Sequence, residues 1–238
     1  MTGDFAVWVY LSRTPLLWLT VTLVAYVVAD RIATATNRHP LANPVLVAIA
    51  LTAAVLEVTH TPYATYFEGA QFVHFLLGPA TVALAFPLYE HRATVLRALA
   101  PMLAALLVGS VVALSSALTL GHLLGVPRAV IVSLAPKSVT TGVAMGIAQT
   151  LGGDPTLAAV LVMLTGMTGG ILVTPLMNAL RIRDMRARGF AAGLAAHGVG
   201  TARAFQVDVV AGAFAGIALG LNAFLTAMLA PIAVSFLR

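Results

Sequence analysis

Long apolar runs separated by short polar connections dominate the chain. A helix needs roughly 20 mostly apolar residues to cross the ~30 Å hydrocarbon core of a bilayer. The pattern, taken with the interrupted runs below, predicts an all-α integral membrane protein with about seven or eight membrane segments. Five runs are continuous and predict complete spans, namely Leu16–Ala29 with one turn beyond Asp30, Leu41–Thr59, Val95–Thr119, Thr156–Leu180 and Val209–Phe236.

Three further runs are apolar but contain residues that break helices. They are residues 70–89 with Gly78-Pro79 and Pro87, residues 127–150 with Pro136-Lys137-Ser138, and residues 189–206 with His197-Gly198-Val199-Gly200-Thr201. A break inside a bilayer leaves backbone N–H and C=O groups unpaired, which is tolerated only where it is buried in protein or faces a watery cavity. These runs therefore predict discontinuous or re-entrant helices.

Arginines near the segment ends limit the topology, because cytoplasmic loops carry an excess of Lys and Arg. One arrangement places every arginine-rich connection in the cytoplasm: Arg31/Arg38, Arg92/Arg97 and the cluster at 181–188. The chain then crosses an even number of times between the last two, so one of the three segments there turns back without spanning, and residues 127–150 are the favoured one. In the alternative, residues 70–89 turn back, residues 127–150 cross and Arg92/Arg97 lie outside.

The order of complete and broken segments indicates a coarse internal repeat. Residues 16–119 and residues 127–236 form its two halves within a single membrane domain, residues 1–238. Paired Gly or Pro interruptions in the two halves of a membrane protein point to the binding site of a transporter.

The composition excludes the soluble classes of protein. Hydrophobic residues make up 60% of the chain and charged residues 9%, with a mean hydropathy of +0.99, whereas a soluble domain has about 25% charged residues. The chain is therefore neither a soluble enzyme nor a nucleic-acid binder. Its net charge of +5 reflects arginines that hold loops at the cytoplasmic side. Since cysteine is absent, disulfides, thiolate catalysis and Cys-bound metal are excluded.

Lys137 is the only lysine, and it lies in the middle of a segment. A basic side chain at the bilayer centre costs about 2.5–3.5 kcal/mol, so it needs an aqueous cavity or an anionic partner. Ser138, Thr140 and Thr141 supply hydroxyl groups and open a new half-helix, whose free N–H groups favour an anion. The pattern predicts a carboxylate site. A loop at 126–136, with Lys137 snorkelling to an interface, is the alternative.

The run from His197 to Arg203 is the second candidate site. Gly198 and Gly200 allow the backbone to approach a ligand, Thr201 can donate a hydrogen bond, and Arg203 can bind a carboxylate in fork geometry. His197 can relay a proton near neutral pH. The alternative is a flexible turn with an interfacial His and Arg.

Three other features are weaker candidates. Gly78-Pro79-Ala80-Thr81 is either part of a site or a proline kink. Glu57 and Glu68 flank a connection; either can be a coupling acid if it lines the cavity, but an exposed loop carboxylate is the commoner outcome. Asn222 lies inside the last span and must pair within the bundle, which more often serves packing than transport.

Enzyme signatures are absent from the sequence, since it has no His-Glu-x-x-His, no Gly-x-Ser-x-Gly and no P-loop. We therefore expect no enzymatic activity, no metal and no cofactor. A transporter of this kind needs a coupling ion at most, for which H⁺ and Na⁺ are the candidates.

Three ordered motifs resemble the LrgB/CidB family. They are Gln71–Tyr89, Ala135-Pro-Lys-Ser-Val-Thr-Thr141 and Ala196-His-Gly-Val-Gly-Thr-Ala-Arg203, and the likeness covers roughly residues 15–236. Typical members have Pro-Ile-Ala after the Thr-Thr pair, where this chain has Gly142-Val143-Ala144. The extra glycine loosens the second half-helix but leaves the lysine and the hydroxyl groups in place.

The resemblance implies two functions. Bacterial members are commonly described as antiholin-like proteins that modulate murein hydrolase activity and autolysis beside a small LrgA/CidA partner. Other members, including the LrgB part of the plastidial glycolate/glycerate translocator, transport small 2-hydroxy or 2-oxo monocarboxylates such as glycolate or pyruvate. The family is also grouped with the cation:proton antiporters and bile-acid symporters, which pair inverted repeats around discontinuous helices.

We therefore expect an ion-coupled monocarboxylate transporter of the inner (plasma) membrane that works with an LrgA/CidA-like subunit and can form homo-oligomers. The expected substrate contacts are Lys137, Ser138, Thr140, Thr141, Gly78, Pro79, Thr81, His197, Gly198, Gly200, Thr201 and Arg203, and the coupling candidates are His197, Glu57 and Glu68. The alternative is a holin-like or antiholin-like regulator of murein hydrolase export. Because polar residues concentrate at the three interruptions, the sequence favours a carrier over a pore.

Overall fold

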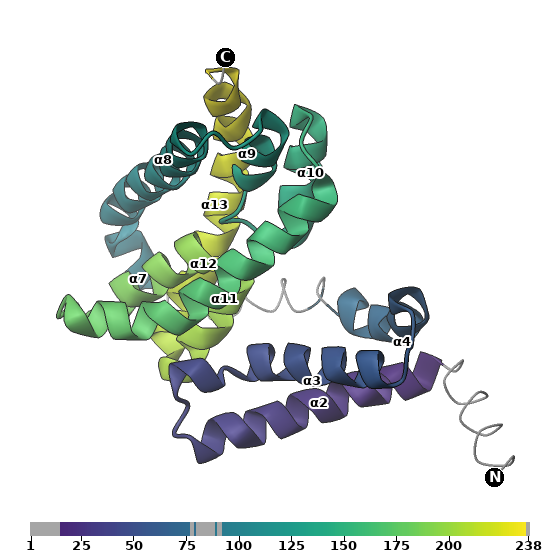
Figure 1. The fold of residues 1–238 in the computed structure, drawn as a ribbon. Coiled ribbons are helices and arrows are strands. Elements are labelled where there is room, and N and C mark those ends of the chain that lie inside the picture. The colour runs from purple at the N-terminus through teal and green to yellow at the C-terminus, as the bar shows by residue number, and fades with distance from the viewer. Residues whose placement is uncertain (1–14, 77–78, 80–88, 90–91, 237–238) are drawn as a thin grey trace, which may run out of the picture. The chain divides into compact units, whose positions relative to one another are not determined.

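The computed structural model describes residues 15–76, 79, 89 and 92–236, which fold into helices without any strand among them (Figure 1). The helices are α2 (Pro15–Ala35), η1 (Pro40–Ala42), α3 (Pro44–Val58), α4 (Tyr63–Phe75), α7 (Arg92–Arg97), α8 (Leu99–Leu123), α9 (Arg128–Leu134), α10 (Thr141–Leu151), α11 (Pro155–Ala179), α12 (Met185–Val207) and α13 (Val209–Ser235). They belong to two compact units, Met1–Ala85 and Phe86–Arg238, each of which is described by itself.

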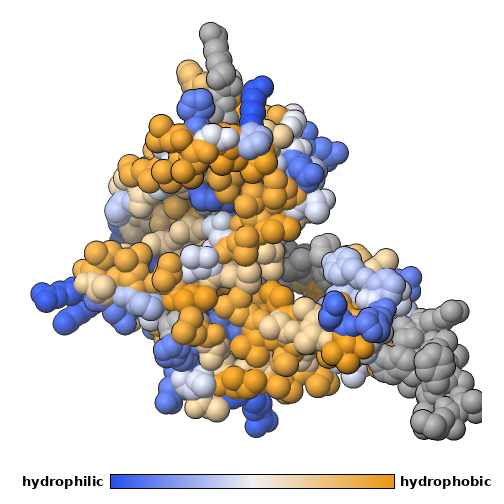
Figure 2. Space-filling view, in the orientation of Figure 1, coloured by the Kyte–Doolittle hydropathy of each residue, from blue (hydrophilic) through white to orange (hydrophobic). Residues whose placement is uncertain are grey.

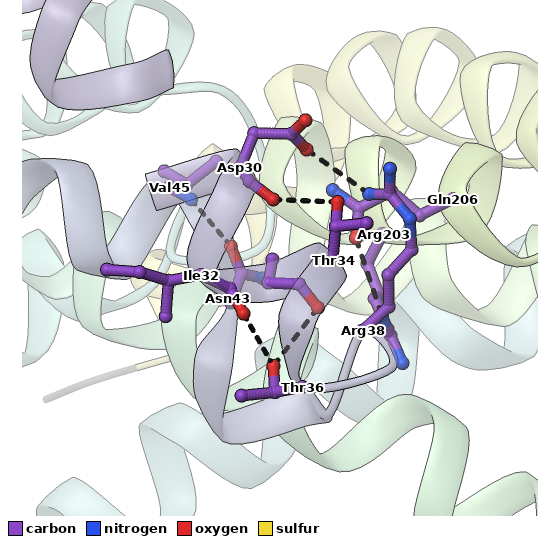
Figure 3. Close-up of polar contacts among 10 residues, drawn as sticks. Asp30, Ile32, Thr34, Thr36, Arg38, Asn43, Val45, Arg203 and Gln206 are labelled. Atoms are coloured by element: carbon purple, nitrogen blue, oxygen red, sulfur yellow. Dashed lines mark hydrogen bonds and ion pairs between the residues drawn. The ribbon is translucent and has the colours of Figure 1, made fainter. Parts of the chain in front are cut away.

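In the first unit, α3 and α4 both pack against α2. The Trp18 ring is fully buried and meets the ring of Tyr66 edge-on, with centroids 6.1 Å apart. Gly69 brings α4 so close to α2 that a Cβ there would overlap the Pro15 carbonyl oxygen. Near the end of α2, Arg38 Nη1 lies 3.4 Å from Asp30 Oδ1 (Figure 3).

One predicted complete span is shorter in the structure than the sequence suggested. The run Leu41–Thr59 divides into η1 and the 15-residue helix α3, about 22 Å long at 1.5 Å per residue. The division occurs at Asn43-Pro44, because the Asn43 side chain accepts the Val45 N–H at 2.9 Å and Pro44 takes the first helical position, where its missing N–H costs nothing.

In the second unit, α9, α10 and the tip between them (residues 135–140) form a re-entrant hairpin, the first hairpin. The backbone N–H of Asp154, just beyond α10, donates to Ser133 Oγ in α9 at 2.7 Å. Leu151, at the end of α10, packs against the apolar cluster that contains Ile131 of α9 and Leu118 of α8. The chain therefore returns to the end of the bundle from which it entered.

The helix α12 forms the second hairpin, because it folds back on itself at Ala196 and His197. Their backbone angles are not helical (φ −125°, ψ 18° and φ 40°, ψ −132°). The two arms then lie side by side, so closely that a Cβ on Gly200 would overlap the carbonyl oxygen of Ala192. In a straight helix these two residues would be about 12 Å apart.

The two hairpins enter from opposite ends of the second unit. The first packs against the C-terminal parts of α8 and α13, through Leu118 and Val234. The second packs against the N-terminal parts of the same helices, through Met102 and Phe214. Each hairpin is followed by a long helix that an aspartate caps: Asp154 accepts from the Leu157 N–H, and Asp208 from the Ala211 N–H.

The unit of one hairpin followed by one long helix therefore occurs twice in opposite orientations. Residues 128–179 and residues 185–235 form the two copies of this inverted repeat. The longer repeat expected from the sequence, residues 16–119 against 127–236, stays a prediction.

This arrangement decides between the two topologies left open by the sequence. Helices α8 and α11, which the first hairpin separates in the sequence, cross in opposite directions. Arg97 and the turn at residues 180–184 therefore lie at the same end of the bundle. We call this the arginine-rich end. Residues 127–150 turn back, and their predicted crossing in the second alternative is wrong. The positive-inside rule assigns the arginine-rich end to the cytoplasm.

The surface of the helices suits a bilayer. Among the described residues, α2, α8, α11 and α13 are long and apolar enough to span a membrane. Many large apolar side chains are exposed on them, including Leu107, Val108 and Phe224. Figure 2 shows apolar side chains over much of the visible face. Such a surface is stable only against lipid or another protein.

The first arm of α12 and helix α13 run parallel and touch at two glycines. A Cβ on Gly189 would overlap the carbonyl oxygen of Ala211, and a Cβ on Gly193 that of Ala215. This is the small-residue packing by which membrane helices approach closely.

We expect Gly193→Ala to lower the free energy of unfolding in detergent by about 1–3 kcal/mol, because the new methyl group forces the two helices apart. Gly220→Ala is the matched control, since Gly220 lies in α13 with open space around it, and it should leave stability unchanged or raise it by up to about 1 kcal/mol. Equal effects in denaturant titrations of the two variants would contradict the close packing.

Candidate functional site

The tip of the first hairpin carries the predicted Lys137 motif. Helix α9 ends at Leu134, and α10 begins at Thr141 with Thr140 as its N-cap. The Thr140 hydroxyl does not cap the helix, so the N–H groups of the first turn of α10 have no capping side chain there. The predicted break and the predicted new half-helix are confirmed.

Lys137 lies at this tip and faces α8. Its Nζ donates a hydrogen bond to the carbonyl oxygen of Ala113, 2.9 Å away, and its side chain is half-buried. Ala113 lies near the middle of the 25-residue helix α8. The ammonium group is therefore well inside the bundle and held by a neutral acceptor, rather than at a helix end.

The tip of the second hairpin is His197. The ring is buried, and its Nε2 lies 3.0 Å from the Val162 carbonyl oxygen of α11. Because a carbonyl only accepts, Nε2 carries the proton in this contact. Gly166 makes room for the ring, since a Cβ there would lie 2.6 Å from Nε2. A φ of 40° costs a residue with a side chain about 1–3 kcal/mol, and such strain is found mostly at functional sites.

Asn222 of α13 joins the two tips. Its Nδ2 donates to the Ser138 carbonyl oxygen in the first tip and to the Leu194 carbonyl oxygen beside the second, each at 3.1 Å. Its Oδ1 accepts from Ser110 Oγ at 2.7 Å and from Thr226 Oγ1 at 3.2 Å. All four hydrogen bonds that a side-chain amide can make are therefore formed.

The break in each hairpin frees the carbonyl that Asn222 binds. In an unbroken α12, Leu194 C=O would accept from the N–H four residues later, but the turn at Ala196 and His197 interrupts that bond. Each of these carbonyls that is left without a partner when the Asn222 donor is lost would cost about 1–3 kcal/mol.

A small apolar contact makes a second link between the hairpins. Val139 in the first tip, Ala144 of α10 and Val162 of α11 are buried together. Val162 is also the residue whose carbonyl holds His197. Ser110, Gly166 and Asn222 each lie near the middle of a long helix, so the two tips meet near half the depth of the bundle.

Both returning arms begin with exposed glycines. Gly142 is the second residue of α10, and Gly198 follows His197; both are exposed, and a Cβ on either would meet no atom within 4 Å. Each arm directs its N-terminal N–H groups toward the middle of the bundle, where a helix N-terminus carries roughly half a positive charge. Backbone donors and open space therefore coincide at both tips.

Other predicted residues of the second motif have different roles. The Thr201 hydroxyl donates to the His197 carbonyl oxygen at 2.9 Å, so it stabilises the turn. Gly200 lets the two arms touch. Arg203 is buried, with Nη1 3.4 Å from Gln206 Oε1 (Figure 3). It lines a small cavity with Arg188 near the base of the hairpin, so the structure does not bring it to the tip.

The remaining sequence candidates belong to the first unit. Glu57 and Glu68 have exposed side chains there, and their coupling role stays a prediction. Pro79 is exposed, whereas Gly78 and Thr81 lie outside the described residues. Among the described residues, no group of three or more His, Asp or Glu side chains could hold a metal ion.

Sequence reasoning assigned Asn222 to packing and overlooked Ser110 and Gly166. Asn222 does serve packing, because its hydrogen bonds hold the two tips together. A carboxamide inside a 27-residue apolar helix was the signal that could have found it. Ser110 and Gly166 carry no such signal, because small residues are common throughout membrane helices.

Known proteins similar to this chain share most of its length. A sequence model of the LrgB-like family matches residues 22–236. The chain is 36% identical to the protein YxaC of Bacillus subtilis over 82% of this chain and 85% of that protein. It is 32% identical to "Holin-like protein CidB" of Staphylococcus epidermidis, and 30% identical to the protein of that name from Staphylococcus aureus, with 92% of this chain and 95% of each relative covered. No solved structure matches.

We expect Asn222→Leu to loosen both tips at once, because it removes the donor shared by Ser138 and Leu194. Amide hydrogen exchange should rise in residues 135–142 and also in residues 194–199, and unfolding should cost about 1–3 kcal/mol less. Thr226→Val is the control, since it removes one hydrogen bond, which averages about 0.6 kcal/mol between membrane helices. Faster exchange at only one tip would contradict the assigned link.

Proposed function

Because this chain belongs to the LrgB-like family, we propose that it is a membrane carrier of small 2-hydroxy or 2-oxo monocarboxylates, the class of glycolate, glycerate and pyruvate. The observation that carries the proposal is the meeting of two re-entrant tips at Asn222. Irregular backbone at membrane depth is tolerated only where it is buried or lines a cavity, and broken helices near the midplane are typical of carrier sites.

The first tip supplies the charge for a carboxylate. Lys137 provides an ammonium group, Ser138, Thr140 and Thr141 lie beside it, and α10 adds the N–H groups of its first turn. In the present structure the ammonium is held by the Ala113 carbonyl. A carboxylate is a much stronger acceptor for an ammonium than a neutral carbonyl, so an arriving substrate would displace Ala113 as its partner.

The second tip supplies a matching surface. Gly198 gives open access to the N-terminus of the returning arm, and Gly200 and Thr201 hold the turn. The strained backbone of His197 supports a role beyond packing, since a glycine would adopt that φ without cost. That Arg203, Gly78, Pro79 and Thr81 contact the substrate stays a prediction.

The coupling ion and the partners belong to the same proposal. His197 is the candidate for carrying H⁺, with Glu57 and Glu68 as further candidate acids, and carbonyls freed at the breaks suit Na⁺. We propose that the protein works in the inner (plasma) membrane with an LrgA/CidA-like subunit, forms homo-oligomers and has no enzymatic activity.

A second candidate function is supported by the names of the relatives. Two of them are called "Holin-like protein CidB", which favours a regulator of murein hydrolase export and autolysis. A pore of that kind would conduct without saturation. The four hydrogen bonds of Asn222 hold the two tips together where they meet. This contact favours a carrier over an open pore.

We expect Lys137→Ala to abolish uptake of radiolabelled glycolate and pyruvate by proteoliposomes, because the substrate loses its cationic partner. Arg128→Ala is the matched control: Arg128 is an exposed basic residue at the base of the same hairpin, and its loss should leave uptake unchanged. Both variants should keep the wild-type midpoint of thermal unfolding in detergent.

Unchanged uptake by Lys137→Ala would contradict the assigned role of the lysine. If wild-type proteoliposomes leak an uncharged dye and show no saturable counterflow of any carboxylate with two to four carbons, the holin-like function replaces the carrier. Uptake that appears only after adding the LrgA/CidA-like subunit would make the partner part of the transport unit.

A further inference from the structure

A long groove in the second unit runs from the arginine-rich end toward the second tip, where Leu194 and Ala195 line its inner end. It has a volume of about 680 Å³ and runs between α8 and the first arm of α12, with the buried Phe214 of α13 at its base. Pro101, Ala105 and Gly109 line it from α8, and Ala98 lines it from the N-cap position of that helix; their spacing of three and four residues is that of one helix face. We refer to it as the α8–α12 groove.

The groove is as long as one leaflet of a bilayer. It extends along α8 from the N-cap residue Ala98 to Gly109, about 16 Å at 1.5 Å per residue, against about 15 Å for half of a ~30 Å hydrocarbon core. Its inner end is closed, because Leu194 fills the space beside Gly109, 2.8 Å from where a Cβ would lie. It therefore opens at the arginine-rich end and stops near the middle of the membrane.

The charges in the groove are confined to its open end. Asp184, Arg186 and Arg97 lie there, and the rest of the lining is apolar. Arg186 is already held by Asp184 through Nη2–Oδ2 and Nε–Oδ1 contacts of 2.6 and 3.0 Å. This hydrogen bonding lowers the pKa of Asp184 to about 2, so the pair stays neutral as a whole at physiological pH. Arg97 is exposed and is the remaining cation of the lining.

We propose that the α8–α12 groove binds one anionic phospholipid of the cytoplasmic leaflet, with an acyl chain along α8 and the phosphate group at Arg97. An apolar channel one leaflet long accepts an acyl chain, and a cation at its mouth selects an anionic headgroup. The Arg–phosphate geometry strengthens that contact. This site does not depend on the transport function.

The binding site can be tested by native mass spectrometry of the full-length protein in detergent micelles, with dioleoyl-phosphatidylglycerol and dioleoyl-phosphatidylcholine at equal concentration. We expect the wild type to retain phosphatidylglycerol preferentially. Arg97→Gln should lower that retention about fivefold, to the level of phosphatidylcholine. Arg183→Gln is the control, because Arg183 is exposed at the same end but does not line the groove, and it should behave as the wild type.

The acyl-chain part of the proposal has its own pair of variants. Ala105→Phe fills the groove and should abolish retention of both lipids. Ala104→Phe adds the same bulk one residue away, at an exposed position outside the lining, and should retain lipid as the wild type does. Thermal unfolding midpoints of all four variants show whether each is folded.

Three results would overturn the proposal. The first is equal retention of the two lipids by the wild type. The second is equal loss in Arg97→Gln and Arg183→Gln. The third is a change of oligomeric state in Ala105→Phe while lipid retention stays at the wild-type level, which would assign the groove to a second copy of the chain.

Discussion

The carboxamide of Asn222 is the contact on which the second unit depends. Two re-entrant hairpins bring interrupted backbone into the middle of a membrane protein, where an unpaired carbonyl costs about 1–3 kcal/mol. Asn222 satisfies one carbonyl from each hairpin, and Ser110 and Thr226 satisfy its own oxygen. One side chain therefore stabilises both breaks and joins them to each other. A movement of one tip would strain its hydrogen bond to Asn222 and so affect the other tip.

Close helix packing makes this meeting possible. Gly189 and Gly193 let the second hairpin touch α13, and Gly166 admits the His197 ring beside α11. Each of these glycines lies inside a helix and makes room for a neighbouring element, rather than forming a turn itself. Membrane helices gain little from burying apolar surface against one another, since lipid is equally apolar. Close contact between small residues and a few saturated polar contacts therefore supply the specificity of the fold.

The family and the architecture bear on the proposed function at different levels. Membership of the LrgB-like family fixes the class of membrane protein, and relatives named holin-like keep the regulatory function in view. The inverted repeat of hairpin and long helix gives the proposed carrier a physical basis. It directs the N-termini of two helices toward the middle of the bundle, and Gly142 at one and Gly198 at the other each have open space beside them. Helix N-termini of this kind suit a small anion.

The sequence by itself determined the class, most of the long helices and the location of two breaks, because apolar run length and helix-breaking residues act locally. It placed Lys137 and His197 at the breaks for the same reason. Tertiary structure decided the direction of the chain after each break, since a proline or a glycine pair permits both a kink and a reversal. It also decided that Asn222 joins the tips and that Arg203 stays at a hairpin base. Those outcomes depend on which groups meet across helices far apart in the sequence, and no local pattern records that.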